Sequence, residues 1–246
     1  MILTVLGKYG PFPAPGGACS GYMLEGGGAK LLIDCGSGTL SRFFSLSQLT
    51  DLDGILISHL HYDHISDLFI LRYALEQLHT RGKDVPIPLL LLAPDKPDME
   101  FRQLAASGVY NIVVIEDGMR AKIKDMTVTF HRLYHTVPSY AMDIDAEGRR
   151  LFYTGDTGSS DRITQLCNGA DLLLADTCFL SGDKIPAYPA HLTAREAGVI
   201  SKAANVRKLL CTHIWGGGYT DAQVLEEVKP VFPQAQVAVE MRSYQI

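Results

Sequence analysis

Residues 58–64 place three histidines and one aspartate within six positions, in the order His59-x-His61-x-Asp63-His64. Imidazole and carboxylate groups are common ligands of divalent metal ions, and an ordinary solvated turn does not gather so many of them. The run over residues 53–57 just before the cluster has the composition of a buried strand. The sequence therefore predicts a metal site in the loop that opens where this strand ends.

Further residues of the same chemical types follow other short apolar runs. Asp156 comes shortly after Tyr153, Asp176 directly follows Ala175, and His213 comes shortly after Cys211. Because polar residues at the ends of neighbouring strands meet at one edge of a sheet, we expect them to converge there. His135, near the end of another apolar run, completes a constellation of five histidines and two aspartates. Its members are His59, His61, Asp63, His64, His135, Asp156 and His213.

Short apolar runs alternate with amphipathic helical stretches, and no linker divides them, which predicts one α/β domain over residues 1–246. A glycine-rich hairpin at residues 25–29 favours mixed rather than purely parallel sheets. The clearest helix start is Thr193, because Thr193-Ala194-Arg195-Glu196 is a capping box. Strands are predicted at residues 31–33, 55–57, 89–92, 109–115, 128–133, 151–153, 172–175, 209–211 and 237–239.

The chain has 22 basic and 27 acidic residues, which gives a formal net charge of −5 at pH 7. Proteins that grip long nucleic acids need an extended positive surface, so we expect a small anionic substrate and no long nucleic acid. No run approaches the roughly 20 apolar residues of a membrane span, and the start lacks a signal-peptide pattern. We therefore expect a cytoplasmic protein with no membrane partner.

The five cysteines are scattered and form no Cys-x-x-Cys pair, which favours free thiols over disulfides or a thiolate zinc site. Cys178 and Cys211 lie close in sequence to candidate ligands, but burial is the expected role for both. Tyr22, Tyr140 and Trp215 could shape a pocket. A glycine run at residues 216–218 could allow the segment after His213 to move, or could simply be a loop.

These motifs resemble those of the metallo-β-lactamase superfamily over nearly the whole chain. The cluster at residues 59–64 is similar to the second motif of that family, His135 to its third, residues 153–157 to its fourth and residues 212–213 to its last. The resemblance implies a four-layer αββα sandwich with mixed sheets and a dinuclear metal centre. It also implies the ligand sets: His59, His61 and His135 for one metal, Asp63, His64 and His213 for the other, and Asp156 as the bridge.

Within that superfamily, residues 135–140 and 191–197 resemble RNase Z, the tRNA-maturing endonuclease, and its small phosphodiesterase relatives. The resemblance implies that His191 is a general acid for the leaving oxygen, with Asp176 as its acidic partner; alternatively, His191 only begins a helix. With Asp63, these two residues are the catalytic candidates. Asp34 resembles a carboxylate that orients a ligand imidazole, although a plain turn aspartate is the alternative.

One departure from RNase Z concerns the arm with which that family holds tRNA between its third and fourth motifs. Only twenty residues separate His135 from Asp156 here, and a hairpin through residues 146–149 fills them. The short connection and the negative net charge argue against tRNA processing.

A ligand set without thiolates suits zinc first and manganese second. The iron-dependent redox members of the superfamily usually carry a glutamate where this chain has His61, which argues against redox chemistry. Two divalent ions can activate a shared water and neutralise phosphoryl charge. The leading hypothesis is a phosphodiesterase that acts through a metal-bound hydroxide on small phosphodiesters such as cyclic nucleotides. A lactone or thioester hydrolase and a non-catalytic metal-binding protein are the alternatives.

Residues 67–78 have the pattern of a helix that is apolar on two faces. The stripe expected to face the core consists of Leu68, Leu71, Ala74, Leu75 and Leu78. The second face carries Phe69, Ile70 and Tyr73. Because a helix that is apolar on two faces needs two partners, we expect a homodimer that uses this helix.

Overall fold

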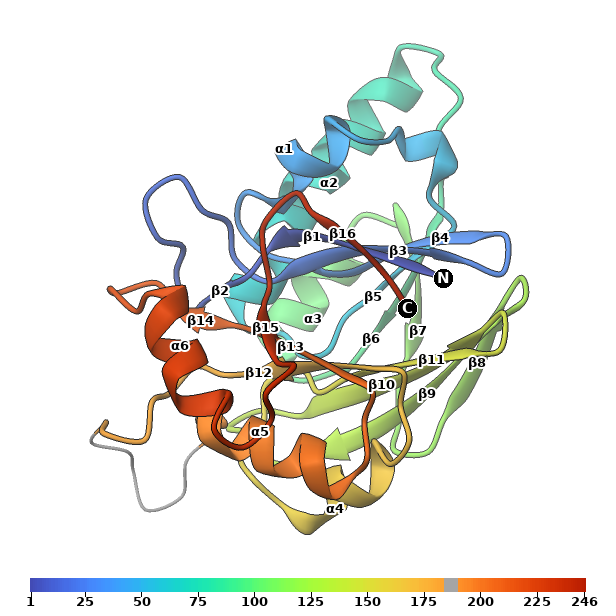
Figure 1. Cartoon of the computed structure of the whole chain (residues 1–246). Helices are drawn as coiled ribbons and strands as arrows, with labels where there is room; N and C mark the ends of the chain where they lie inside the picture. Colours follow the sequence, from blue (N-terminus) through green and yellow to red (C-terminus); the bar gives the residue numbers. More distant parts are fainter. Residues whose placement is uncertain (184–189) are drawn as a thin grey trace.

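The computed structural model describes residues 1–183 and 190–246, and two seven-stranded sheets face each other at its centre (Figure 1). The first sheet has the spatial order β16 (Ser243–Gln245), β1 (Ile2–Gly7), β3 (Gly21–Gly26), β4 (Ala29–Cys35), β5 (Gly54–Leu56), β6 (Leu89–Ala93) and β7 (Tyr110–Val114). The second has the order β15 (Gln236–Val237), β13 (Lys208–Thr212), β12 (Leu172–Asp176), β11 (Arg149–Tyr153), β10 (Ser139–Ala146), β9 (Met126–Leu133) and β8 (Arg120–Ile123). The short strands β2 (Tyr9–Gly10) and β14 (Ile214–Trp215) pair in parallel with each other.

Helices cover the outer faces of both sheets (Figure 1). Those that pack on the first sheet are α1 (Thr39–Phe44), α2 (Tyr62–Thr80) and α3 (Asp98–Ala105), with a 3-10 turn, η1 (Leu49–Asp51), after α1. Those on the second sheet are α4 (Asp161–Leu166), α5 (Ala194–Ala203) and α6 (Asp221–Val228). Both sheets contain parallel and antiparallel pairs, so the predicted four-layer αββα arrangement with mixed sheets is confirmed. Among the described residues, no helix combines the length and apolar character needed to cross a membrane.

The central strands of the first sheet, β1 and β3 to β6, are largely buried on both faces. Leu31 and Ile33 of β4 belong to the cluster between the sheets, together with Phe130 and Tyr153 of the second sheet. Leu32 points to the opposite face, into the cluster under α1 and α2. Because successive strand residues alternate between faces and both faces are covered, such strands are apolar without interruption. This explains why short apolar runs mark them so clearly in the sequence.

Each of the nine predicted strands overlaps an observed strand, and the ends differ by at most two residues. The last one, predicted over residues 237–239, is β15, which ends at Val237. The chain then leaves the second sheet for the first, where the backbone N–H of Met241 donates to the carbonyl of Val5. Strands β1, β2, β3, β8, β10, β14 and β16 lie outside the predicted ranges. In β10 the acidic residue Asp143 interrupts the apolar run, yet its carboxylate accepts bonds of 2.7 and 2.8 Å from Arg150 in the paired strand.

The predicted turns and cap are confirmed. Gly27 and Gly28 join β3 to β4 with φ values of 53° and 72°, a left-handed pair that favours glycine in a tight hairpin. Residues 147 and 148 likewise join β10 to β11 in a short hairpin. At α5 the Thr193 Oγ1 accepts from the N–H of Glu196 at 3.1 Å, and the Glu196 carboxylate accepts from the N–H of Thr193 at 2.8 Å.

Helix α2 has the two apolar faces that its sequence indicates, but Phe69, predicted on the outer face, packs against the core instead. Leu68, Leu71 and Leu75 are fully buried against the first sheet. On the opposite side Ile70 and Tyr73 are 58% and 56% exposed. The inner face therefore anchors the helix, while the outer face has no cover within the described part of the chain.

Candidate metal centre

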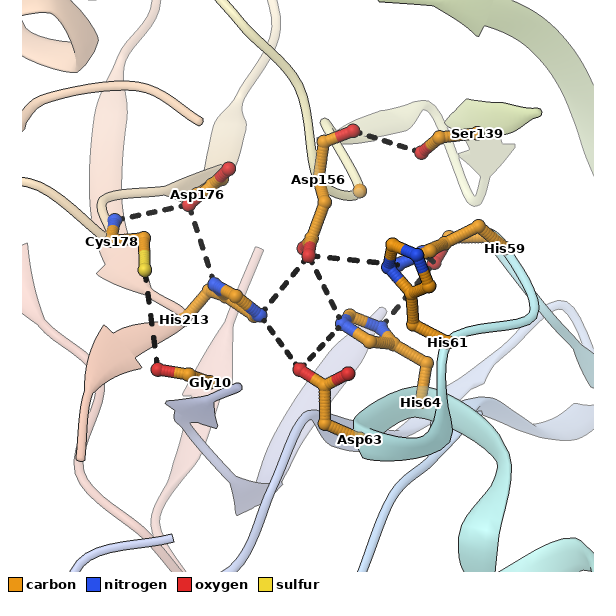
Figure 2. A network of polar contacts seen from close by, with 12 residues as sticks. Gly10, His59, His61, Asp63, His64, Ser139, Asp156, Asp176, Cys178 and His213 are labelled. Atoms are coloured by element: carbon orange, nitrogen blue, oxygen red, sulfur yellow. Dashed lines mark hydrogen bonds and ion pairs between the residues drawn. The ribbon is translucent and has the colours of Figure 1, made fainter. Parts of the chain in front are cut away.

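The constellation expected from the sequence assembles at one edge of the two sheets (Figure 2). His59 follows β5, and His61 is the N-cap residue of α2, whose first turn carries Asp63 and His64. His135 follows β9, Asp156 follows β11 and His213 follows β13. Each ligand candidate thus stands where a strand or helix ends, and the packing of the two sheets brings all seven together.

Three imidazoles form the first cluster. His59 Nε2 lies 3.0 Å from His61 Nδ1, and His135 Nε2 lies 3.1 Å from that same atom. Ligands around a tetrahedral ion with bonds of 2.0–2.1 Å stand roughly 3.3 Å apart, so this spacing suits one small divalent cation. Burial lowers the pKa of all three histidines, well below the ordinary value for His59. Their neutral rings therefore keep the lone pairs that metal binding requires.

Two carboxylates and two imidazoles form the second cluster. His213 Nε2 lies 3.1 Å from Asp63 Oδ2 and 3.1 Å from Asp156 Oδ2. His64 Nε2 lies 3.5 and 3.4 Å from those same two oxygens. All four side chains are more than nine-tenths buried. Such a set of nitrogen and oxygen donors, without thiolate, suits a borderline or hard divalent ion.

Asp156 stands between the two clusters. Besides its contacts to His64 and His213, its Oδ2 lies 3.6 Å from His59 Nε2. Figure 2 shows the carboxylate at the middle of the dashed network, with imidazoles on both sides. The Oγ of Ser139 donates to the backbone carbonyl of Asp156 at 2.9 Å and fixes the loop that carries it. The arrangement gives Asp156 the position that a bridging ligand requires.

Three buried atoms of the second cluster have no hydrogen-bond partner among the described residues: His64 Nε2, Asp156 Oδ1 and His213 Nδ1. Buried polar atoms are almost always partnered, so such atoms indicate a missing ion or water. Burial opposes the ionisation of Asp156, but the positive fields of His213 and His64 hold its pKa well below the usual range. The site therefore fits divalent cations by donor type, spacing and charge.

The carboxylate of Asp34 fixes the orientation of His64. It accepts a hydrogen bond of 2.8 Å from His64 Nδ1, which leaves His64 Nε2 directed at the second cluster. The same carboxylate accepts from the Ser58 N–H at 2.8 Å and from the Tyr153 hydroxyl at 2.7 Å. Asp34 has a left-handed φ of 55° and is fully buried, so it is part of a built polar network, not a plain turn residue.

His191 and Asp176 lie beside the second cluster. His191 Nδ1 donates to Asp176 Oδ2 at 2.9 Å, and the His191 ring stacks on His213 with centroids 5.2 Å apart. Asp176 Oδ1 also lies 3.5 Å from His213 Nδ1. Burial opposes protonation of His191, but the charge and hydrogen bond of Asp176 prevail and raise its pKa. The pair therefore favours the protonated form of an imidazole next to the candidate metal centre.

Sequence reasoning overlooked several contacts that shape the centre. His135 Nδ1 donates to the carbonyl of Ala190 at 2.9 Å, and a Cβ on Gly10 would collide with the His213 ring. Ser58 and Tyr153, which hold Asp34, stand next to recognised motifs, so their positions alone could have suggested a supporting role.

The remaining histidines and the three aromatic residues singled out in the sequence lie outside the two ligand clusters. Tyr22 does not shape a pocket, because it is fully buried and its hydroxyl bonds Thr212 Oγ1 at 2.6 Å. Tyr140 is also buried, whereas Trp215, two residues after His213, is half-buried. His79 lies exposed at the far end of α2, and His131 lies within β9. All five cysteines are free and buried, as expected.

Comparison with known proteins places these observations in a family. The family described as beta-lactamase superfamily domain matches residues 29–214. A protein of Bacillus subtilis (strain 168), the probable metallo-hydrolase YhfI, is 33% identical over 232 residues, which cover 94% of each protein. The ribonuclease Z of Brevibacillus brevis is 26% identical over 312 residues, which cover 100% of this chain and 97% of that enzyme.

Solved structures show the same fold. The crystal structure of YhfI from Bacillus subtilis matches with a TM-score of 0.90 and 29% identity over 99% of both chains. A diphosphatase from the PhnP family matches with a TM-score of 0.75 and 19% identity, over 100% of this chain and 97% of that one.

Proposed function

Because the chain belongs to the beta-lactamase superfamily of metallo-hydrolases, we propose that it is a phosphodiesterase that cleaves small phosphodiesters such as cyclic nucleotides. The observation that carries this proposal is the hydrogen-bonded pair of His191 and Asp176 beside the two ligand clusters. An alkoxide leaving from phosphorus must be protonated, and a histidine held by a carboxylate is suited to that task. Hydrolysis of an activated lactone or thioester depends less on a general acid than this reaction does.

The seven clustered residues would hold two divalent ions, zinc by preference and manganese as the second choice. His59, His61 and His135 form one set, Asp63, His64 and His213 the other, and Asp156 joins both. When bound, such ions supply Lewis-acid activation of a water molecule and neutralise phosphoryl charge. The buried carboxylates of Asp63 and Asp156 would supply negative charge to offset part of the charge of such ions.

His191 is the proposed general acid. Because its Nδ1 donates to Asp176, its other nitrogen, Nε2, is left to face a leaving oxygen. The side chain is 19% exposed, so a substrate at the centre can reach it. Asp176 in turn accepts from the N–H groups of Thr157 and Cys178, at 3.2 and 3.0 Å, which fixes the carboxylate behind the imidazole. Asp176 is therefore a positioning residue, and His191 the group that meets the substrate.

Two features support a small substrate over tRNA. The connection between His135 and Asp156 is a plain hairpin of β10 and β11, with no room for an RNA-binding arm. The net charge of −5 also lacks the excess of positive charge that a long polyanion requires. Ribonuclease Z and a diphosphatase among the similar proteins support phosphoester chemistry as the reaction class.

A substrate panel tests the proposal. The protein is reconstituted with zinc or with manganese and assayed against bis(p-nitrophenyl) phosphate, cyclic nucleotides, a thioester and an acyl-homoserine lactone. We expect turnover of the phosphodiesters by the loaded protein and none after chelation. Turnover of the lactone or thioester with inert phosphodiesters would instead favour the alternative hydrolase, and no turnover with metal bound would favour a non-catalytic metal protein.

We also propose that the chain forms a homodimer through the outer face of α2. Ile70 and Tyr73 on this face and Phe44 at the end of α1 are between 46% and 58% exposed. A hollow beside them is lined in part by Leu40, Phe44 and Ile70. A second copy placed there would remove these apolar side chains from water.

A further inference from the structure

An aromatic pair formed by Phe12 and Trp215 lies on the two segments that flank Gly10 and His213. The rings of Phe12 and Trp215 meet edge to face, with centroids 5.1 Å apart and an interplanar angle of 69°. Phe12 is 43% exposed and Trp215 is half-buried, so part of the aromatic surface remains open to solvent. The pair makes no hydrogen bond or ion pair with the metal ligands, Asp34, Asp176 or His191 among the described residues.

The backbone ties the pair to the second cluster. Trp215 follows His213 by two residues, so their Cα atoms are at most about 7 Å apart. Its strand β14 pairs with β2, with Trp215 opposite Gly10 and Ile214 opposite Tyr9. Gly10 lies so close to His213 Nε2, one of the donor atoms of the second cluster, that a Cβ there would collide with it. The loop that carries Phe12 therefore starts directly against the centre.

The two loops are held close to each other and to the rest of the molecule. Gly216 approaches the Phe12 carbonyl so closely that a side chain there would collide with it. Arg42 donates to the carbonyls of Gly16 and Leu6 at 2.8 and 2.6 Å and pairs with Glu240 at 2.6 Å. The Glu240 carboxylate also accepts from the N–H of Ala18 at 2.8 Å. The loop over residues 10–17 is thus fixed at its far end, and the aromatic pair is positioned before any ligand arrives.

We propose that Phe12 and Trp215 form a binding site for the nucleobase of the substrate, which makes the phosphodiester a nucleotide. This inference rests on the proposed phosphodiesterase function and specifies its substrate class. Because Trp215 follows His213 by two residues, a base on the aromatic pair and a phosphate at the ligand clusters would lie within the reach of one nucleotide. Stacking against an aromatic side chain accepts any base, because every base offers a π-face. The site therefore selects for a nucleoside group without selecting strongly for its identity.

Trp215 is the single tryptophan of the chain, so the intrinsic indole emission reports on this site alone. The metal-loaded protein is titrated with AMP, and ribose 5-phosphate serves as a control that carries a phosphate and a sugar but no base. We expect AMP to quench the emission with saturation and ribose 5-phosphate to leave it nearly unchanged. An emission that does not respond to AMP, or that responds equally to both compounds, would overturn the nucleobase site.

Kinetics with two matched esters gives the second test. Thymidine 5′-(p-nitrophenyl) phosphate and methyl p-nitrophenyl phosphate release the same phenolate, but only the first carries a nucleoside. Loss of one stacking partner weakens base binding by about 5- to 100-fold. We therefore expect Trp215→Ala to raise the KM of the thymidine ester by that factor and to spare the methyl ester. Trp215→Phe, which keeps an aromatic ring, should retain most of the affinity, and Phe12→Leu should resemble Trp215→Ala in direction.

The results of these experiments distinguish a failure of the nucleobase site from a failure of the phosphodiesterase function on which it rests. An equal loss on both esters in Trp215→Ala would contradict a nucleobase site while leaving the phosphodiesterase intact. If the loaded wild-type protein cleaves neither ester, the phosphodiesterase proposal fails, and the AMP titration still decides whether the aromatic pair binds a base. Thermal unfolding of each variant checks that the fold is preserved.

Discussion

The carboxylate of Asp34 accepts a 2.8 Å hydrogen bond from Nδ1 of His64, and both side chains are completely buried. This contact joins the end of β4 to the first turn of α2, and Ser58 and Tyr153 donate to the same carboxylate. A ligand imidazole held in this way can present only its other nitrogen to an ion. Through Asp34, the buried core between the sheets therefore fixes the orientation of a ligand in the candidate metal centre.

We predict that Asp34→Asn weakens metal binding. Asparagine tolerates the left-handed backbone at this position but carries no charge to hold the His64 ring. Changes to such outer partners typically cost 10- to 100-fold in metal affinity, which competition with a chromogenic chelator measures. Asp53→Asn is the matched control, because Asp53 accepts hydrogen bonds from Lys30 and Lys124, away from the centre. Equal affinity in the wild type and Asp34→Asn would show that Asp34 does not orient the ligand.

Replacement of His191 should separate catalysis from metal binding. We expect His191→Ala to lower kcat on an unactivated phosphodiester by about 10²- to 10⁴-fold, since the leaving alkoxide loses its proton donor. Elemental analysis should find the same metal content as in the wild type. The loss should be smaller on bis(p-nitrophenyl) phosphate, whose phenolate leaves without assistance. A wild-type rate on both substrates would remove His191 from the reaction.

The pH profile should depend on Asp176. This carboxylate raises the pKa of His191, so the imidazole stays protonated to higher pH than an ordinary histidine. A general acid works in its protonated form, and activity is therefore lost as the pH rises through that pKa. Asp176→Asn removes the charge that raises the pKa, so the basic limb of the kcat profile should move to lower pH. A basic limb at the same pH in both proteins would contradict this role of Asp176.

Metal removal should destabilise the fold. Ions that bind only the folded chain stabilise it, by about 2.7 kcal/mol when the free ion is at 100 times its Kd. For a chain of this size, chelation should then lower the Tm by about 5–10 °C in thermal unfolding, and added zinc should restore it. His79→Ala, which removes an exposed histidine remote from the clusters, should keep the full response. A Tm that chelation does not change would contradict a metal site built from buried ligands.

The exposed apolar residues on the outer face of α2 predict a homodimer. We expect the wild type to elute as a dimer at micromolar concentration in size-exclusion chromatography with light scattering. Ile70→Lys should give monomers, because a charged side chain would have to be buried in the interface. Val199→Lys changes an equally exposed apolar residue on α5 and should leave the dimer intact. A monomeric wild type would refute the interface.

Local sequence patterns determined much of this protein. Apolar runs marked the strands that are buried on both faces, and the capping box marked the start of α5, because these signals act over a few residues. The ligand candidates were also visible, since their chemistry and their places at strand ends are local properties. The strand β10, interrupted by Asp143, was less visible because its stability comes from pairing with neighbouring strands.

Tertiary structure alone decided which groups meet. The hydrogen bond from Tyr153 to Asp34 spans 119 positions, and the contact of Asp63 with His213 spans 150. The aromatic pair of Phe12 and Trp215 likewise depends on the ladder between β2 and β14. Such contacts depend on how the two sheets pack and on where a missing Cβ allows two backbones to approach. The metal-ligand candidates could be identified from the sequence. The packing of the two halves set the distances between them and the residues that support them.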